Sequence, residues 1–128
     1  MIPQLIIALT LVAEAGGVPS ENAMSRVYTV IHNRSNGTVE DMAKVCLKPH
    51  QFSCWSDNSL MERSRHSKSL PIALQIVKKH AVRGEIGQAR HYLASFLYRS
   101  PKCPKWAKTG RITYDEGPKG HVFLEGVK

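Results

Sequence analysis

The first apolar feature of the chain is a run from Leu5 to Ala13 that is interrupted only by Thr10. Because the run is not striped with polar positions, it is typical of a helix that is buried all round. Gly16 and Gly17 follow it and form a strong helix stop. The run falls short of the roughly 18 apolar residues that a spanning helix needs. We therefore predict a buried first helix and no stable membrane insertion.

A secretory signal is the competing interpretation of the same segment. Ala13, Glu14 and Ala15 resemble a small-residue cleavage site after an apolar region. A signal peptide also needs a positive start, and no Lys or Arg precedes Arg26. We favour the folded helix. Cleavage before Gly16 would remove Glu14, which is the main candidate for catalysis below.

Three further segments have the hydrophobic spacing of helices. They cover residues 20–36, 38–46 and 69–83, and they end at Asn36-Gly37, Lys48-Pro49 and Gly84. Acidic residues in the first turn of the second segment favour a helix there. The predicted N-caps are Ser20 and Thr38, and Ser69 opens the third segment.

The rest of the chain predicts a small β element. Residues 50–69 are polar and irregular, and residues 89–96 fit either a helix or a strand. Residues 111–114 and 121–124 read as two short strands joined by a Gly-Pro turn. We predict an α+β fold, mostly helical with a small antiparallel β element, in one domain over residues 1–128.

Charge is unevenly distributed along the chain. The net charge is +8, and residues 65–128 carry 13 Lys and Arg against 4 Asp and Glu, whereas residues 1–64 carry 5 against 6. A basic half attracts a polyanion, which can be nucleic acid, anionic lipid or an anionic polymer of the bacterial envelope. A surface kept basic only for solubility is the plainer interpretation.

Cysteine and histidine spacing gives no sign of a metal site. The three cysteines, Cys46, Cys54 and Cys103, contain no Cys-x-x-Cys pair, and the six histidines show no ligand spacing. We therefore predict reduced thiols, no metal and no cofactor.

Glu14 has an unusual setting for a carboxylate. The negative end of the predicted helix dipole opposes its ionisation, and the apolar residues before it remove water from it. Both effects favour the protonated form near neutral pH, which is the form that a general acid needs to break a glycosidic bond. The two glycines that follow leave room for a bulky polymer. A surface carboxylate at an ordinary helix end is the alternative.

Several blocks in order resemble one family. The stretch from Ala13 to Pro19 precedes a helix that ends in Asn33-Arg34, and residues 51–55 read Gln-Phe-Ser-Cys-Trp. Residues 89–92 read Ala-Arg-His-Tyr, 104–106 read Pro-Lys-Trp, and 120–123 read Gly-His-Val-Phe. Together these blocks resemble the cell wall hydrolases of the spore cortex-lytic (SleB-like) type, which are similar in fold to lysozymes and lytic transglycosylases.

The resemblance implies a peptidoglycan-cleaving enzyme with Glu14 as its catalytic residue. It departs from the family pattern at Val18, where a second Glu is common, and at Arg90, where a Thr is common. The first departure leaves Glu14 as the only carboxylate of that motif, and the second leaves the sugar contacts near His91 in doubt. The implied substrate-binding residues are Gln51, Ser53, Trp55, His91 and Tyr92.

A single carboxylate fits a lytic transglycosylase better than a hydrolase. Glycosidases that use water normally need two carboxyl groups, and Asp57 has no matching motif. The family resemblance implies cleavage of the β-1,4 bond between N-acetylmuramic acid and N-acetylglucosamine. The expected partners are glycan strands and, through the basic half, anionic envelope polymers. We expect a monomeric phage endolysin that is made in the host cytoplasm and acts on the wall; a virion enzyme or a bacterial remodelling enzyme are alternatives.

Two rival functions use other residues. A cysteine-dependent amidase or peptidase would use Cys54 as nucleophile and His91 or His121 as base. A non-enzymatic basic module would bind nucleic acid through its lysines. The chain has no recognisable nucleic-acid motif and no Gly-rich phosphate loop, so we expect no nucleic acid as partner.

Overall fold

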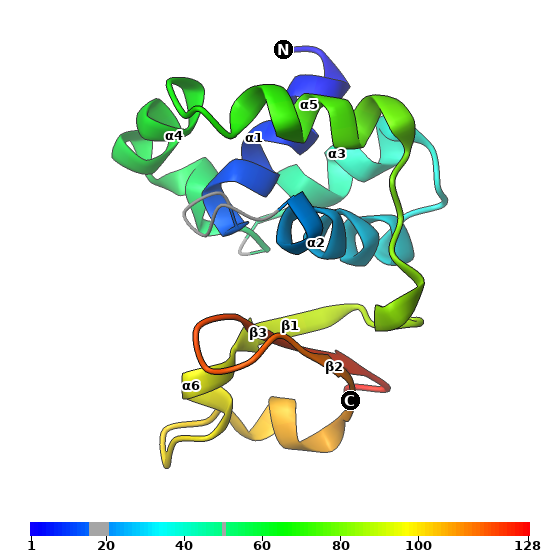
Figure 1. Ribbon diagram of the computed structural model, residues 1–128, viewed down its shortest axis with the longest axis vertical. Coiled ribbons are helices and arrows are strands. Elements are labelled where there is room, and N and C mark those ends of the chain that lie inside the picture. The colour runs from blue at the N-terminus through cyan, green and yellow to red at the C-terminus, as the bar shows by residue number, and fades with distance from the viewer. Residues whose placement is uncertain (16–20, 50) are drawn as a thin grey trace. The chain divides into compact units, whose positions relative to one another are not determined.

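The structure is a computed structural model that describes residues 1–15, 21–49 and 51–128. The chain divides into two compact units, unit 1 (Met1–Val82) and unit 2 (Arg83–Lys128), and each is described by itself. Unit 1 is helical and unit 2 holds the sheet (Figure 1). This content confirms the predicted α+β class. The organisation as one catalytic domain stays a prediction.

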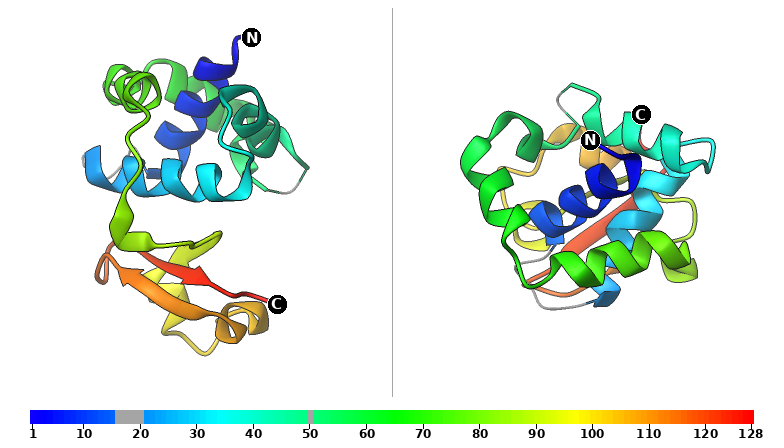
Figure 2. Two further views of the ribbon diagram at one scale, coloured as in Figure 1. Left: turned by 90° about the vertical axis from the view of Figure 1, so that its right-hand side faces the viewer. Right: turned by 90° about the horizontal axis from the view of Figure 1, so that it is seen from above.

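Unit 1 is built around its first helix. Helix α1 packs against each of the other α-helices of the unit, and it lies in their middle in the view from above (Figure 2). The elements of unit 1 are α1 (Pro3–Ala15), α2 (Glu21–Arg34), α3 (Val39–Leu47), the 3-10 helix η1 (Ser53–Ser56), α4 (Asn58–Arg65) and α5 (Leu70–Lys79).

The apolar composition of α1 explains its central place. Residues from Ile6 to Val12 are all buried, so that helix has no solvent face over two turns. The predicted buried helix is therefore confirmed; its predicted stop at Gly16-Gly17 lies outside the described residues. No helix of the described part of the chain is long and apolar enough to cross a membrane.

Helix α3 begins and ends as the sequence predicts. The hydroxyl of Thr38 accepts a hydrogen bond from the backbone N–H of Asp41, which satisfies one of the free donors of the first turn. Glu40 and Asp41 lie in that turn, where the helix dipole favours negative charge. Helix α2 ends at Arg34, two residues before the predicted Asn36-Gly37 stop, and its predicted N-cap Ser20 lies outside the described residues.

The prediction of an irregular segment over residues 50–69 is wrong for most of its length. Helix α4 begins after Asp57, whose carboxylate caps it by accepting from the N–H of Leu60. Only Met61 and Ser64 of this helix are buried. Two buried residues are too few to give a recognisable helical spacing of hydrophobic positions. The capping residue is therefore the only strong sequence signal of this helix.

Helix α5 ends at Lys79, before the predicted stop at Gly84. The residue that ends it is His80, which adopts the left-handed conformation with φ of 52°. Non-glycine residues rarely adopt this conformation without a compensating contact. Here the ring Nδ1 of His80 forms a 2.6 Å hydrogen bond with the hydroxyl of the buried Tyr28. A contact between distant residues, invisible in local sequence, therefore sets the end of α5.

Unit 2 is a three-stranded antiparallel sheet of order β1-β3-β2. The two strands that the sequence predicts, at residues 111–114 and 121–124, are confirmed as neighbours, and residues 89–96 contain both a strand and a short helix. One small core packs Leu93, Val122 and Leu124 against Ala107. The elements are η2 (Gly84–Ile86), β1 (His91–Ala94), α6 (Ser95–Tyr98), η3 (Lys105–Thr109), β2 (Arg111–Asp115) and β3 (His121–Glu125).

Truncation of a side chain at the centre of α1 tests this arrangement. Leu9 has no exposed surface, so Leu9→Ala leaves a cavity and should lower the free energy of unfolding by about 2–5 kcal/mol. Ile72 is 42% exposed on α5, and Ile72→Ala is the matched control that should change stability by less than about 1 kcal/mol. Urea unfolding of the two variants measures both. Equal effects would contradict a central α1.

Candidate active site

Glu14 lies in the last turn of α1 and is half-buried. It follows Thr10 by four residues, so the two side chains lie on the same face of the helix, one turn apart. Its negative charge acts on the thiols of Cys46 and Cys54, which belong to α3 and η1. The carboxyl group therefore lies in unit 1 beside the segment that contains the Gln-Phe-Ser-Cys-Trp block.

The hydroxyl of Thr10 connects α1 to that block. Thr10 is fully buried, and its hydroxyl donates to the carbonyl of Ile6 over 2.8 Å. The same oxygen accepts a 3.0 Å hydrogen bond from Nε1 of Trp55. The indole ring is thus fixed against the helix one turn before Glu14.

Trp55 and Ser53 line one cavity of about 460 Å³. The indole ring is half-buried, so part of its surface is anchored on Thr10 while part faces this cavity. An exposed aromatic face and a nearby hydroxyl are the groups that contact a sugar ring and its hydroxyls. The remaining lining residues are Leu47, Lys48, Pro49, Phe52 and Ser56.

Arg34 holds the start of the block in place. Its Nη1 donates to Oε1 of Gln51 over 2.8 Å, and its guanidinium lies 5.9 Å from the centre of the Phe52 ring. Phe52 is buried and Gln51 is exposed. The Asn-Arg end of α2 therefore contributes to the position of the block.

Burial makes the two thiols of this site poor nucleophiles. Desolvation raises the pKa of Cys54 to about 11, with a further contribution from the charge of Glu14. Desolvation raises the pKa of Cys46 to about 12. Because the thiolate is the reactive form, a buried thiol that keeps its proton at neutral pH does not support nucleophilic catalysis by Cys54. All three cysteines are free thiols.

His91 and Tyr92 lie in unit 2 and do not share a surface. They are consecutive residues of β1, so their side chains point to opposite faces of the sheet. The ring of His91 contacts Trp106 at 5.6 Å between centroids, on the side of η3. The ring of Tyr92 contacts His121 at 5.0 Å on the other face. The structure therefore groups Glu14, Gln51, Ser53 and Trp55 in unit 1 and leaves these two residues apart from each other.

Three residues of the site were not singled out as contacts by the sequence: Thr10, Arg34 and Phe52. The one available signal for Thr10 is its polarity within an apolar run, because a buried hydroxyl needs hydrogen-bond partners. One of those partners, Trp55, lies 45 residues further along the chain. Local patterns cannot reveal such a pairing.

His121 has a structural role in the turn before β3. Its Nδ1 lies 3.2 Å from Oε1 of Glu116, and its backbone N–H donates to the same oxygen over 2.9 Å. The side chain of Glu116 is only 7% exposed, and its carboxylate is engaged by His121 at the end of the turn before β3. Within the described residues, no group of three or more His, Cys, Asp or Glu is placed to hold a metal ion.

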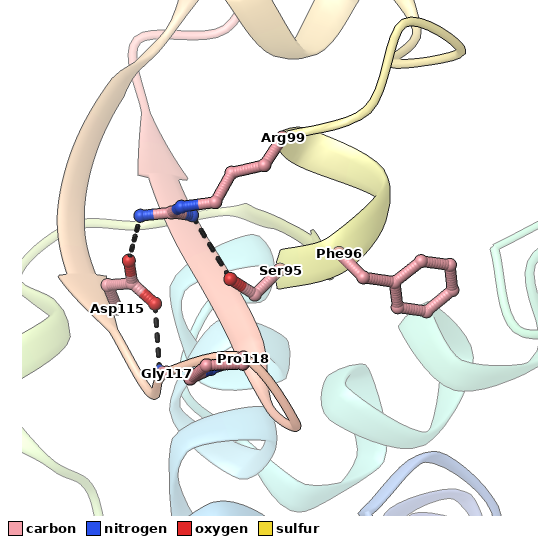
Figure 3. A pocket seen from close by; sticks show the side chains of 6 residues that line it. All are labelled: Ser95, Phe96, Arg99, Asp115, Gly117 and Pro118. Atoms are coloured by element: carbon pink, nitrogen blue, oxygen red, sulfur yellow. Dashed lines mark hydrogen bonds and ion pairs between the residues drawn. The ribbon is translucent and has the colours of Figure 1, made fainter.

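Unit 2 contains a second pocket, of about 320 Å³, between α6 and the turn that joins β2 to β3 (Figure 3). The guanidinium of Arg99 lies between Asp115 and Ser95 and binds both, at 2.5 and 3.1 Å. The backbone N–H of Gly117 and this guanidinium lower the pKa of Asp115. The charges of the pocket therefore satisfy each other, and the ring of Phe96 points away from them.

Comparison with known proteins gives one match. The family model described as Cell Wall Hydrolase matches residues 19–124, most of the chain. The matched range begins after Glu14 and includes Gln51, Ser53, Trp55 and the strands of unit 2. Searches of curated proteins and of solved structures found no match.

Removal of the Thr10 hydroxyl tests the link between α1 and the block. Thr10→Val keeps the shape of the side chain but leaves Nε1 of Trp55 without its acceptor, which should cost about 1–3 kcal/mol of stability. Trp55→Phe removes the donor, and the double variant should cost less than the sum of the two. Urea unfolding of the four proteins gives this coupling energy. Strictly additive effects would contradict the hydrogen bond.

Buried acidic groups also predict a loss of stability at high pH. Burial raises the pKa of Tyr28 and Cys46 to about 12 and of Cys54 to about 11, so the folded state holds protons that the unfolded chain releases. The stabilisation is complete below about pH 9 and should be lost as pH rises through 9 to 12. Chemical unfolding across this range measures it, and Cys46→Ala with Cys54→Ala should make the decline shallower. A rise in stability over this range would contradict the assignment.

Proposed function

The chain belongs to the Cell Wall Hydrolase family, and we propose that it is a lytic transglycosylase that uses Glu14, a residue that precedes the matched range. The family makes it a peptidoglycan-degrading enzyme. The proposed bond is the β-1,4 linkage between N-acetylmuramic acid and N-acetylglucosamine. The observation that carries the proposal is the hydrogen bond from Trp55 to Thr10, one helical turn before Glu14. It ties a cavity with an aromatic wall to the helix that bears the carboxyl group.

The proposed reaction needs one carboxyl group in two successive roles. Glu14 protonates the glycosidic oxygen, and the bond from this oxygen to C1 of N-acetylmuramic acid breaks. The carboxylate then takes the proton from the 6-hydroxyl of the same sugar. That oxygen attacks C1 and closes a 1,6-anhydro ring. Glu14 returns to its protonated form, and no water is consumed.

The surroundings of other carboxylates support this mechanism over hydrolysis. A hydrolase normally needs a second carboxyl group to activate water or to act as nucleophile. Asp57, the alternative considered from the sequence, caps α4 with its Oδ1 and is exposed. Its hydrogen bond to the N–H of Leu60 gives it a structural role.

The substrate contacts follow from the cavity. We propose that Trp55 stacks on a sugar ring and that Ser53 and Gln51 contact sugar hydroxyl or amide groups. For His91 and Tyr92 a contact with the glycan stays a prediction from the family resemblance. The endolysin role, the virion alternative and the monomeric state also stay predictions from the sequence.

Replacement of Glu14 tests the catalytic assignment. Glu14→Gln keeps the size of the side chain but cannot donate or accept the required proton, so the rate of glycan cleavage should fall by about 10²–10⁴-fold. Glu21→Gln is the matched control, because Glu21 is exposed at the start of α2. It should keep full activity. Unchanged activity of Glu14→Gln would refute the proposal.

The products distinguish the mechanism and the rival nucleophile. Mass spectrometry of digested peptidoglycan should detect 1,6-anhydro ends, which are lighter by one water than the products of hydrolysis. Reducing ends that have gained water would indicate a lysozyme-type reaction of the same site. The Cys54→Ala variant should retain full activity. A loss of activity in this variant would favour the cysteine-dependent alternative.

A further inference from the structure

The four carboxylates of unit 2 are each paired with a basic side chain. The unit contains nine Lys and Arg against four Asp and Glu, and all its residues are described. Each of the four carboxylates interacts with a basic side chain. The pairs are Arg83 with Glu85, Arg99 with Asp115, Arg111 with Glu125, and His121 with Glu116.

Among the five lysines of unit 2, three that are close in sequence have no carboxylate partner. Lys102, Lys105 and Lys108 recur at every third position, they are exposed, and no carboxylate of the described residues lies within ion-pair distance. We call these three residues the lysine rim. No acidic residue occurs between Ser100 and Tyr114, so no negative charge in this segment reduces the potential of the rim.

The fold holds the rim on one small core. Lys105 is the first residue of η3, and Lys108 lies one turn later in the same helix. Residues three apart in a 3-10 helix lie on the same face. Between them, Ala107 is fully buried against the sheet. Lys102 precedes Cys103, which packs against the same core. Folded contacts therefore bring the three charges to the edge of one hydrophobic cluster.

The position of Lys108 is further restricted by an aromatic ring. Its ammonium group lies 3.8 Å from the centre of the Tyr98 ring, which packs on the same core. This cation–π contact orients the charge without neutralising it. The rim is thus partly preorganised, which lowers the entropy lost when an anion binds.

We propose that the lysine rim binds a phosphodiester-linked anionic polymer of the bacterial wall and so keeps the enzyme near its substrate. The inference rests on the proposed function and specifies one partner for it. Lysine ammonium groups act as point charges that bind phosphates without demanding a fixed geometry. A flexible chain with phosphates at intervals fits three such charges better than a ligand that needs a bidentate arginine, because Arg83, Arg99 and Arg111 are already engaged in ion pairs.

The same surface is a poor match to nucleic acid. Sequence-independent binding of single strands uses aromatic faces on which bases stack. Here Lys108 covers a face of the Tyr98 ring, and Trp106, although 39% exposed, already contacts the ring of His91. The helices of unit 2 have at most five residues, too few to lie along a major groove and read it.

Co-sedimentation with purified walls tests the proposal. The walls carry a polyol-phosphate polymer and are used before and after hydrofluoric acid has removed it. The rim variant combines Lys102→Gln, Lys105→Gln and Lys108→Gln. The control variant combines Lys68→Gln, Lys78→Gln and Lys79→Gln, three exposed lysines of unit 1, and so has the same net charge. All proteins also carry Glu14→Gln, so that they do not digest the walls.

The expected result is selective. The rim variant should bind untreated walls about ten- to a hundredfold more weakly than the control variant, on the basis of about 1 kcal/mol for each lysine near an anionic surface. Both variants should bind stripped walls equally. Added salt should weaken the control variant more steeply than the rim variant on untreated walls.

Several results would overturn the proposal. Equal binding of both variants to untreated walls would show that the rim is not the contact. Equal losses on untreated and stripped walls would assign the rim to the glycan itself. A rim-dependent gel shift with duplex DNA, without a rim-dependent effect on walls, would assign it to nucleic acid. Cleavage of soluble glycan strands by the rim variant with Glu14 intact reports on the proposed function separately, and it should be unchanged.

Discussion

A hydroxyl group buried inside an apolar helix must find hydrogen-bond partners, and much of unit 1 is arranged to provide them for Thr10. Its own helix supplies an acceptor at Ile6, and the distant Trp55 supplies a donor. The second bond is possible only if η1 lies against α1. A single polar group in the most apolar part of the chain therefore fixes the segment that lines the candidate substrate cavity.

The same constraint links the helix that carries the carboxyl group to one wall of the cavity. Glu14 follows Thr10 by one turn of a rigid helix, so whatever positions Thr10 also positions Glu14. Arg34 fixes the block from its other end through Gln51 and Phe52. Rigid elements on both sides are the setting in which a catalytic group keeps a defined geometry.

Local sequence predicts the elements whose signals are local. The all-apolar run predicts α1, the cap at Thr38 predicts α3, and the alternation around residues 111–124 predicts β2 and β3. Helix α4 is missed because it buries only two side chains, and α5 is predicted too long because a tertiary contact at His80 ends it. In the candidate site, Glu14 and the block are predictions from motifs, whereas the contacts of Thr10 and Arg34 depend on partners that are distant in sequence.

The hydrogen bond between Tyr28 and His80 has a consequence for how the chain can vary over time. Glycine suits a left-handed backbone better than histidine does, so position 80 would drift toward glycine if local conformation alone mattered. Histidine offsets its strain through the buried phenol, and a phenylalanine at position 28 would remove that compensation. Substitutions at these two positions, 52 residues apart, are therefore tolerated best when they occur as a pair.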